Sequence, residues 1–229
     1  TAAKYDITRA EQDAYAIRSY QNTALNTENR VFSNEIVGVC VPQRRGETRL
    51  ILEDEEYKNV KFEKIPQLRA AFSPTGTVTA ANASTMNDGA AALILASAAA
   101  VKKYDLKPLA KILSFADTAH EPAWFTTAPT HAAPKALALA KLAVTDVDYF
   151  EVNEAFSVVP LAFNKILNID INKVNVLGGA VSLGHPLGAS GARIVTTLQN
   201  VLQSKDATIG CAAICNGGGG ASALVIERV

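Results

Sequence analysis

The chain has 229 residues, 48% of them hydrophobic, which is enough to bury a sizeable core in one large domain or two small ones. Its 22 basic and 22 acidic residues leave no net charge, so the composition gives no reason to expect binding to nucleic acid or to an anionic membrane. The longest mostly apolar run, residues 90–101, is too short to span a bilayer.

The first predicted element is a helix that begins near Thr8. Thr8 and Glu11 form the pattern of a capping box, and a weakly apolar stripe at helical spacing follows to Ala24. Residues 35–41 then alternate between apolar and polar side chains, as a strand does. Residues 43–64 carry many charges of both signs, which is typical of a solvated loop or excursion.

Residues 77–104 are predicted to form a strand, a turn and a long helix. Asn87 or Asp88 can cap that helix, and Ser84 by itself is interpreted as a turn serine that bonds to nearby backbone. The segment up to Tyr104 is rich in alanine and apolar nearly all round, so we expect the helix to be buried.

A second domain is predicted to begin near residues 106–108, which divides the chain into 1–106 and 107–229. We expect strands over 110–115 and 149–152 and helices over 131–142 and 157–167. Pro134 is placed in the first turn of its helix, where proline is tolerated. Val159, Phe163, Ile166 and Leu167 should bury one face of the last helix. His120 and His131, in or beside loops, are interpreted as ordinary histidines.

An apolar strand over 174–177 then leads into a glycine-rich turn with His185 at its centre. Pro186 and Gly188 flank the start of a helix whose apolar residues recur from Ile194 to Leu202. A histidine held at a stiff junction is a candidate acid–base or oxyanion-binding group. On this segment alone, a glycine-rich turn with an incidental histidine is an equally good interpretation.

The chain ends in a predicted hairpin, with strands over 207–215 and 221–226 joined by Asn216 and four glycines. Cys215 lies at the edge of this turn, and the glycine N–H groups suit a developing negative oxygen. Asn153 and Glu154 follow the strand over 149–152, so polar residues stand at the ends of strands, where open α/β sheets place their sites.

The cysteines are predicted to be reduced thiols in an intracellular protein, because there are three of them and they lack metal-ligand spacing. Cys211 and Cys215 share one face of a strand and are not expected to form a disulfide. Cys40 and Cys211 are interpreted as small buried hydrophobic residues.

Three segments together resemble the C-terminal signatures of the thiolase family: NEAFS at 153–157, GGAVSLGHPLGASG at 178–191 and CNGGGG at 215–220. Their order and separations also match. The resemblance covers essentially the whole chain, and the flanking sequence is most similar to the biosynthetic acetoacetyl-CoA thiolases. It implies an α/β fold of mixed sheets layered with helices. Residues 1–106 would be the end of the N-terminal domain with the coenzyme A-binding loop region, and 107–229 the C-terminal domain.

The resemblance also implies the chemistry, a reversible Claisen condensation of two acetyl-CoA molecules. Cys215 would be the general base and acid, and its pKa would have to be lowered for it to act as a thiolate. His185 and a water held by Asn153 would stabilise the enolate oxygen, and His185 would help to activate the acyl-accepting cysteine. The N–H of Gly217 would bind the acyl-enzyme carbonyl oxygen. Glu154 would be structural and position its neighbours.

Ligand-binding residues are implied by position. Tyr20, Asn59, Lys61 and Lys64 would line the nucleotide end of coenzyme A, where the lysines would meet phosphates. Ser84 would lie near the pantetheine arm. In the potassium-dependent branch, Tyr20 and carbonyl groups near Ala80, Ala81, Ala83 and Val181 would surround a potassium ion. No covalent cofactor is implied.

One departure from the family stands out: no motif here carries the acyl-accepting cysteine. Neither Cys40 nor Cys211 lies in the right context. We therefore expect a C-terminal portion of a longer thiolase that turns over only with its N-terminal complement. The family assembles as dimers or tetramers. Similarity to the biosynthetic branch favours the cytoplasm, with mitochondria as the alternative.

Three alternatives remain open. A degradative 3-ketoacyl-CoA thiolase shares the same motifs and chemistry. A non-catalytic thiolase-like module that binds acyl-CoA or lipid would not require Asn153, His185, Cys215 and Gly217 together. A ketoacyl synthase relative would be expected to carry a second histidine where Cys215 stands.

Overall fold

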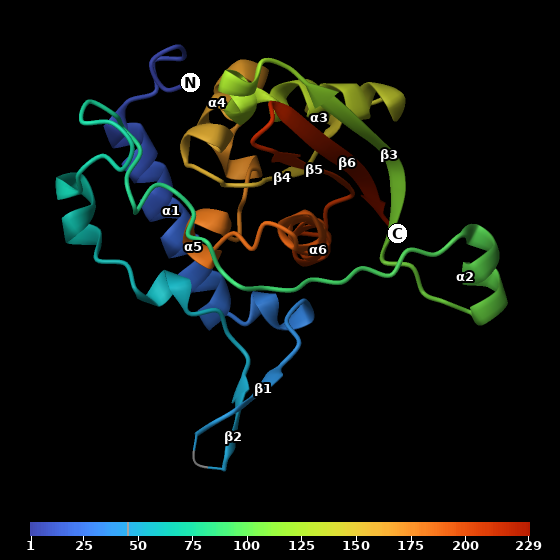
Figure 1. Ribbon diagram of the computed structural model, residues 1–229. Coiled ribbons are helices and arrows are strands. Elements are labelled where there is room, and N and C mark those ends of the chain that lie inside the picture. Colours follow the sequence, from blue (N-terminus) through green and yellow to red (C-terminus); the bar gives the residue numbers. More distant parts are fainter. Residues whose placement is uncertain (45) are drawn as a thin grey trace.

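The computed structural model describes residues 1–44 and 46–229. Its main sheet has four strands in the order β3 (Ala110–Ala119), β6 (Gly220–Arg228), β5 (Ile209–Cys215) and β4 (Tyr149–Val152) (Figure 1). β6 pairs antiparallel with both β3 and β5, whereas β4 pairs parallel with β5. The expectation of an α/β fold with a mixed sheet is therefore confirmed. β4 has the predicted bounds, and β3 runs four residues beyond the predicted end at 115.

Helices cover both faces of this sheet. On one face, α3 (Pro129–Leu139) and α4 (Val158–Leu167) pack apolar side chains against the strands, with the rings of Phe163 and Phe150 5.7 Å apart. On the other face, α6 (Ser190–Ser204) packs Ile194, Leu198 and Leu202 against the sheet. Each such leucine or phenylalanine contributes about 1.5–3 kcal/mol when fully buried. These two layers hold the strand ends in fixed positions.

The first half of the chain is built around α1 (Arg9–Glu28). Its predicted capping box is present: the Thr8 hydroxyl accepts from the Glu11 N–H at 3.1 Å, and the Glu11 carboxylate accepts from the Thr8 N–H at 2.6 Å. After the short 3-10 helix η1 (Val31–Asn34), β1 (Val39–Pro42) and β2 (Thr48–Ile51) form a hairpin that projects from the body (Figure 1). Of the strand predicted over 35–41, only the part from Val39 onward forms a strand.

The segment predicted as a charged loop, 43–64, holds β2, the 3-10 helix η2 (Glu56–Lys58) and the start of η3 (Phe62–Gln67). None of the described helices is long and apolar enough to cross a membrane.

The prediction of a long buried helix from residue 88 to Tyr104 was wrong. Only α2 (Ala98–Tyr104) is helical, none of its residues is buried, and Met86 and Ile94 are 90% and 94% exposed. A helix that is apolar all round is stable in water only when other elements cover it, because most helical stability in proteins comes from packing. Within the described residues, nothing buries α2.

The prediction of a strand over 174–177 was also wrong, because of the backbone conformation of one residue. Val174 and Val176 form only isolated bridges, because Asn175 between them has a positive φ of 49° that interrupts extended backbone. Its side chain compensates for this interruption: the Asn175 amide accepts from the Val152 N–H and donates to the Val152 carbonyl, both at 2.8 Å. A helical turn, α5 (Ala180–Leu183), then precedes His185.

Three smaller expectations also need correction. α3 begins at Pro129, so Pro134 lies inside the helix and not in its first turn. Cys40 is exposed on β1, whereas Cys211 is buried as expected. Ile166 is 37% exposed, although its neighbours Val159 and Phe163 are fully buried.

Candidate active site

The three polar segments singled out in the sequence lie near one end of the parallel pair β4 and β5. Asn153 directly follows β4, and its backbone N–H donates to the carbonyl of Ala213 at 2.9 Å. Cys215 ends β5, two residues beyond Ala213. Because parallel strands end at the same edge of a sheet, the topology places Asn153 and Cys215 at one edge.

His185 joins this edge from the junction between α5 and α6. Its Nε2 atom lies 3.2 Å from Nδ2 of Asn153, and its backbone N–H donates to the carbonyl of Thr85 at 2.9 Å. Both side chains are buried, Asn153 completely. The Oδ1 atom of Asn153 has no hydrogen-bond partner among the described residues, so it can accept from a group that enters the site.

Ser190 determines which nitrogen of His185 carries the proton. Its Oγ lies 2.6 Å from Nδ1 of His185 and donates to the carbonyl of Pro186 at 3.1 Å. Both contacts can form at once only when Nδ1 of His185 is the donor to Oγ, because the hydroxyl has one proton and gives it to Pro186. Nε2 is then left as an acceptor, which fits the Asn153 amide N–H that faces it. Ser190 was not among the predicted site residues, although it lies within the GGAVSLGHPLGASG motif at the start of α6.

The electrostatic environment keeps both candidate groups neutral. Burial, and secondarily the charge of Arg193, lowers the pKa of His185. Burial raises the pKa of Cys215 to about 11. The lowered pKa expected for Cys215 is therefore absent: this cysteine is a protonated thiol near neutral pH, packed with the core residues on the α3 and α4 side of the sheet.

The turn after Cys215 is organised by Asn216. Its side-chain oxygen accepts from the N–H groups of Gly218 and Gly220, at 3.2 and 3.3 Å. Gly217 is exposed, and its N–H donates to no acceptor in the described part of the chain. It is thus free to bind an oxygen of a substrate. Gly219 has a φ of +89°, and a Cβ there would collide with the carbonyl oxygen of His120.

Glu154 is the structural centre behind the site. Its carboxyl oxygens accept from the Tyr15 hydroxyl at 2.7 Å, the Ser19 hydroxyl at 2.8 Å and the Val181 N–H at 3.0 Å. The Asn175 amide donates to it as well, at 3.0 Å. These contacts join α1, α5 and the segment around Asn175 to the end of β4. They agree with the structural role expected for Glu154.

The residues assigned to coenzyme A do not all lie close to the candidate active site. Ser84 lies close to the site, since both its N–H and its hydroxyl donate to the carbonyl of Ala155, at 3.1 and 3.0 Å. Asn59, Lys61 and Lys64 are exposed around the 3-10 helices η2 and η3, and no contact ties them to His185. Tyr20 is 5% exposed and stacks edge-on with Phe62, which belongs to the same segment.

The groups expected around potassium are chemically suitable for it. Tyr20 and Val181 lie in one buried cluster, and burial raises the pKa of Tyr20 to about 12, so its hydroxyl stays neutral. Within the described residues, the carbonyl groups of Ala80, Ala81 and Ala83 accept no hydrogen bond. Neutral hydroxyl and carbonyl oxygens are the ligands that a hard cation prefers.

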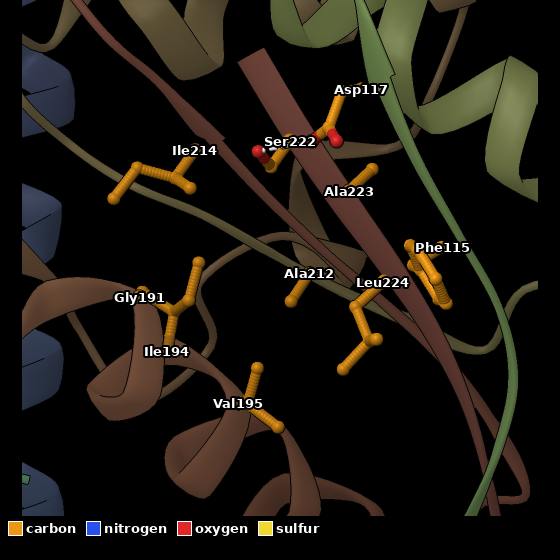
Figure 2. Close-up of a pocket in the computed structure, with 10 residues that line it drawn as sticks. All are labelled: Phe115, Asp117, Gly191, Ile194, Val195, Ala212, Ile214, Ser222, Ala223 and Leu224. Carbon is orange, nitrogen blue, oxygen red and sulfur yellow. Dashed lines mark hydrogen bonds between the residues drawn. The ribbon is translucent and has the colours of Figure 1, made fainter.

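Two hollows lie near α6. One, of about 320 Å³, lies between the first two turns of α6 and the strands β3, β5 and β6, and is lined mainly by apolar residues such as Ile194, Val195 and Leu224 (Figure 2). None of the predicted site residues lines it. The other, of about 400 Å³, is bordered by residues 87–91 and by 186–189, directly after His185. This second hollow adjoins the candidate active site.

Comparisons with known families and proteins point to one enzyme class. Residues 1–99 match the family description "Thiolase, N-terminal domain", and residues 106–228 match "Thiolase, C-terminal domain". An acetyl-CoA acetyltransferase of Schizosaccharomyces pombe is 55% identical, with 100% of this chain and 58% of the relative covered. A cytosolic acetyl-CoA acetyltransferase of Gibberella zeae is 53% identical (98% and 57% covered). A mitochondrial one of Bos taurus is also 53% identical (100% and 54% covered).

Solved structures agree with this result. A thiolase from Ascaris suum in complex with coenzyme A superposes with a TM-score of 0.93 at 48% identity, over 100% of this chain and 58% of that one. Human mitochondrial 3-ketoacyl-CoA thiolase gives 0.96 at 38% identity, with 100% and 58% covered. The chain thus spans somewhat more than half the length of these relatives.

Proposed function

Since this chain belongs to the thiolase family, we propose that it supplies the acid–base and oxyanion-binding groups of an acetyl-CoA C-acetyltransferase. That enzyme would join two acetyl-CoA molecules into acetoacetyl-CoA and free coenzyme A, and would catalyse the reverse thiolysis. The observation that carries the proposal is the buried contact between Nε2 of His185 and the Asn153 amide, 3.2 Å apart, at the sheet edge where Cys215 ends β5.

In the first half-reaction, an acetyl group moves from coenzyme A to the acyl-accepting cysteine. The neutral His185 receives the proton of that thiol on Nε2, which Ser190 leaves as the acceptor. Coenzyme A leaves as a thiolate, and Cys215 gives it a proton. A cysteine with a pKa raised to about 11 is in the correct protonation state for this step.

In the second half-reaction, the resulting Cys215 thiolate removes an α-proton from the second acetyl-CoA. The enolate oxygen is stabilised by the proton now on Nε2 of His185 and by a water bound to Asn153. Its carbon attacks the acyl-enzyme carbonyl, whose oxygen accepts from the Gly217 N–H. The acyl-accepting cysteine then leaves as a thiolate and takes its proton back from Nε2 of His185, so the enzyme returns to its starting form.

This proposal includes a partner and ligands. The N-terminal half of the same thiolase would contribute the acyl-accepting cysteine, and the assembly would be a homo-dimer or homo-tetramer. Coenzyme A would contact Tyr20, Asn59, Lys61, Lys64 and Ser84. Potassium would be held by Tyr20 and the carbonyl groups of Ala80, Ala81, Ala83 and Val181. We place the enzyme in the cytoplasm; its relatives carry both cytosolic and mitochondrial names.

The nearest rival is a degradative 3-ketoacyl-CoA thiolase with longer substrates. The curated relatives of 51–55% identity carry the name acetyl-CoA acetyltransferase. Sequence identity alone does not separate the two, because a Bacillus anthracis acetyl-CoA acetyltransferase and the human 3-ketoacyl-CoA thiolase are both 38% identical to this chain. Rates of thiolysis with acetoacetyl-CoA and with a longer 3-ketoacyl-CoA separate the two. A marked preference for the longer substrate would favour the rival.

The proposed function is tested by producing the chain together with an N-terminal half of a thiolase. Native mass spectrometry establishes whether the two associate, and thiolysis of acetoacetyl-CoA is assayed on the same sample. We expect an active complex that Cys215→Ser inactivates and that Cys40→Ser, on the exposed β1, leaves active. Full activity of this chain alone, or in Cys215→Ser, would refute the proposal. Binding of acyl-CoA without turnover would indicate the non-catalytic module.

A further inference from the structure

Residues 83–89 contact both of the segments that supply the candidate catalytic side chains. At one end, Ala83 forms an isolated antiparallel bridge with Phe156, and the N–H and hydroxyl of Ser84 donate to the carbonyl of Ala155 at 3.1 and 3.0 Å. Both partners belong to the NEAFS motif, whose first residue is the asparagine that contacts the histidine. This end of the stretch is therefore fixed to the asparagine side of the site.

The rest of the stretch lies against the turn that carries His185. The carbonyl of Thr85 accepts from the backbone N–H of His185 at 2.9 Å. A Cβ on Gly184 would lie 2.2 Å from Oδ1 of Asn87, so only a glycine lets the turn approach this side chain so closely. Two neighbouring residues of the turn are thus held by two residues of the stretch.

One hydrogen bond within the stretch links these two contacts. The hydroxyl of Thr85 donates to Oδ1 of Asn87 at 2.7 Å, and this is the same oxygen that lies against the turn. Farther along, Gly89 meets Pro186, because a Cβ on Gly89 would lie 2.6 Å from Cγ of the proline ring. The stretch follows the turn on both sides of the histidine.

Regular secondary structure and apolar packing do not fix this stretch. Residues 84–97, which the structure describes in full, form neither a helix nor a strand. Met86, between Thr85 and Asn87, is 90% exposed. The conformation of the stretch therefore depends on its polar contacts and on its close approach to the turn that carries His185.

We propose that Thr85 and Asn87 are positioning residues for His185. Their hydrogen bond fixes the stretch, the stretch fixes the backbone of His185, and Ser84 ties the same stretch to the NEAFS motif. Together these contacts set the 3.2 Å approach of Nε2 of His185 to Nδ2 of Asn153. The catalytic consequence rests on the proposed function, but the effect on the backbone of His185 is a property of this chain alone.

The test is hydrogen exchange of the His185 backbone N–H, followed by NMR in the 229-residue chain. Thr85→Val removes the donor of the internal hydrogen bond, and Asn87→Ala removes its acceptor. Each should speed exchange at His185 about three- to tenfold, as expected for the loss of one hydrogen bond. The Asn153 N–H, which donates to the carbonyl of Ala213 in the sheet, is the internal reference and should exchange at the wild-type rate.

Thr85→Ser keeps the hydroxyl and should stay close to the wild type. Thr208→Val is the matched control, because Thr208 is exposed just before β5, at the end of that strand far from the site. If Thr85→Val fails to fold, Asn87→Ala decides. Unchanged exchange at His185 in a folded Asn87→Ala would overturn the inference. Equal acceleration at His185 and Asn153 would also overturn it, because that result shows only a general loss of stability.

The catalytic consequence is measured in the reconstituted enzyme. Thr85→Val should lower kcat about tenfold and change KM less than about twofold, because His185 is displaced without loss of a substrate contact. Thr85→Ser should restore most of the rate. Faster exchange with an unchanged kcat would overturn the positioning role. An inactive wild-type complex would count against the proposed function only, and the exchange measurement would still decide whether Thr85 and Asn87 hold the backbone of His185.

Discussion

The hydroxyl of Tyr15 donates to Oε1 of Glu154 at 2.7 Å, across 139 residues of chain. Both groups are buried, so removing the hydroxyl leaves a carboxyl oxygen short of a partner. We expect Tyr15→Phe to lower the free energy of unfolding by about 1–3 kcal/mol. Urea denaturation measures it, with Tyr104→Phe as the control because Tyr104 is 63% exposed. Equal stability of both variants would show that this contact contributes nothing.

Two glycines of the quoted motif should respond in opposite ways to alanine. A Cβ at Gly179 would collide with the carboxyl carbon of Glu154, so Gly179→Ala should destabilise the chain by about 1–3 kcal/mol. Gly191 is in α6 with open space around it, and Gly191→Ala should stabilise by roughly 0.5–1 kcal/mol. Thermal unfolding of the two variants beside the wild type tests the difference in sign.

The three thiols should react with iodoacetamide in a fixed order. Cys40 is exposed and should react first. Burial raises the pKa of Cys215 to about 11 and that of Cys211 to about 12. Because the thiolate is the nucleophile, labelling of Cys215 should increase about tenfold for each pH unit between 7 and 10. Peptide mass spectrometry follows each site. Rapid labelling of Cys215 at pH 7 would contradict the assigned protonation state.

Stability should fall as the pH rises from about 5 to 8. Glu35 and Glu151 titrate near their ordinary value of 4.5 when unfolded, but at about 7 and about 8 when folded. In this window the folded chain binds more protons than the unfolded chain, so raising the pH favours unfolding. Glu151→Gln removes one of the two titrating carboxyl groups. It should reduce the loss of unfolding free energy between pH 5 and 8 by ~1–3 kcal/mol. Urea denaturation at each pH, with the exposed Glu121→Gln as the control, gives the comparison.

Ser190 should affect the rate of thiolysis, because it sets which nitrogen of His185 carries the proton. In Ser190→Ala, Nδ1 of His185 loses its acceptor, so both neutral tautomers become populated and Nε2 is an acceptor only part of the time. Thiolysis by the reconstituted enzyme should fall about tenfold or more, and Ser190→Thr should restore most of it. Ser204→Ala, at the other end of α6, should leave the rate unchanged. A fully active Ser190→Ala would show that the hydrogen bond from Ser190 to His185 does not determine the rate of thiolysis.

Much of the architecture was predictable because local patterns agree with the final packing. The Thr8 capping box, the strand over 149–152 and the closing hairpin each follow from short-range periodicity and turn residues. The candidate site residues were located by motif and not by geometry. Their meeting at one sheet edge depends on the parallel pairing of β4 and β5, which separate segments of the sequence do not show.

The features that could not be predicted from the sequence depend on contacts between residues far apart in the chain. The alanine-rich segment before Tyr104 has the pattern of a buried helix, but within the described residues it has nothing to be buried against. Asn175 takes a left-handed conformation that is stabilised by contacts with Val152 and Glu154. The contact between Glu151 and Arg193 joins residues 42 positions apart, on a strand and a helix that only the fold brings together.

The side chain of Asn175 has a further consequence for how this sheet meets other proteins. β4 is an edge strand, and such an edge offers free N–H and carbonyl groups to which a foreign strand can pair. Asn175 occupies those groups: its side-chain amide bonds both polar groups of Val152, and its own N–H donates to the carbonyl of Phe150 at 3.0 Å. One residue thus closes the edge that leads to Asn153, and it protects that strand from strand addition and edge-to-edge aggregation.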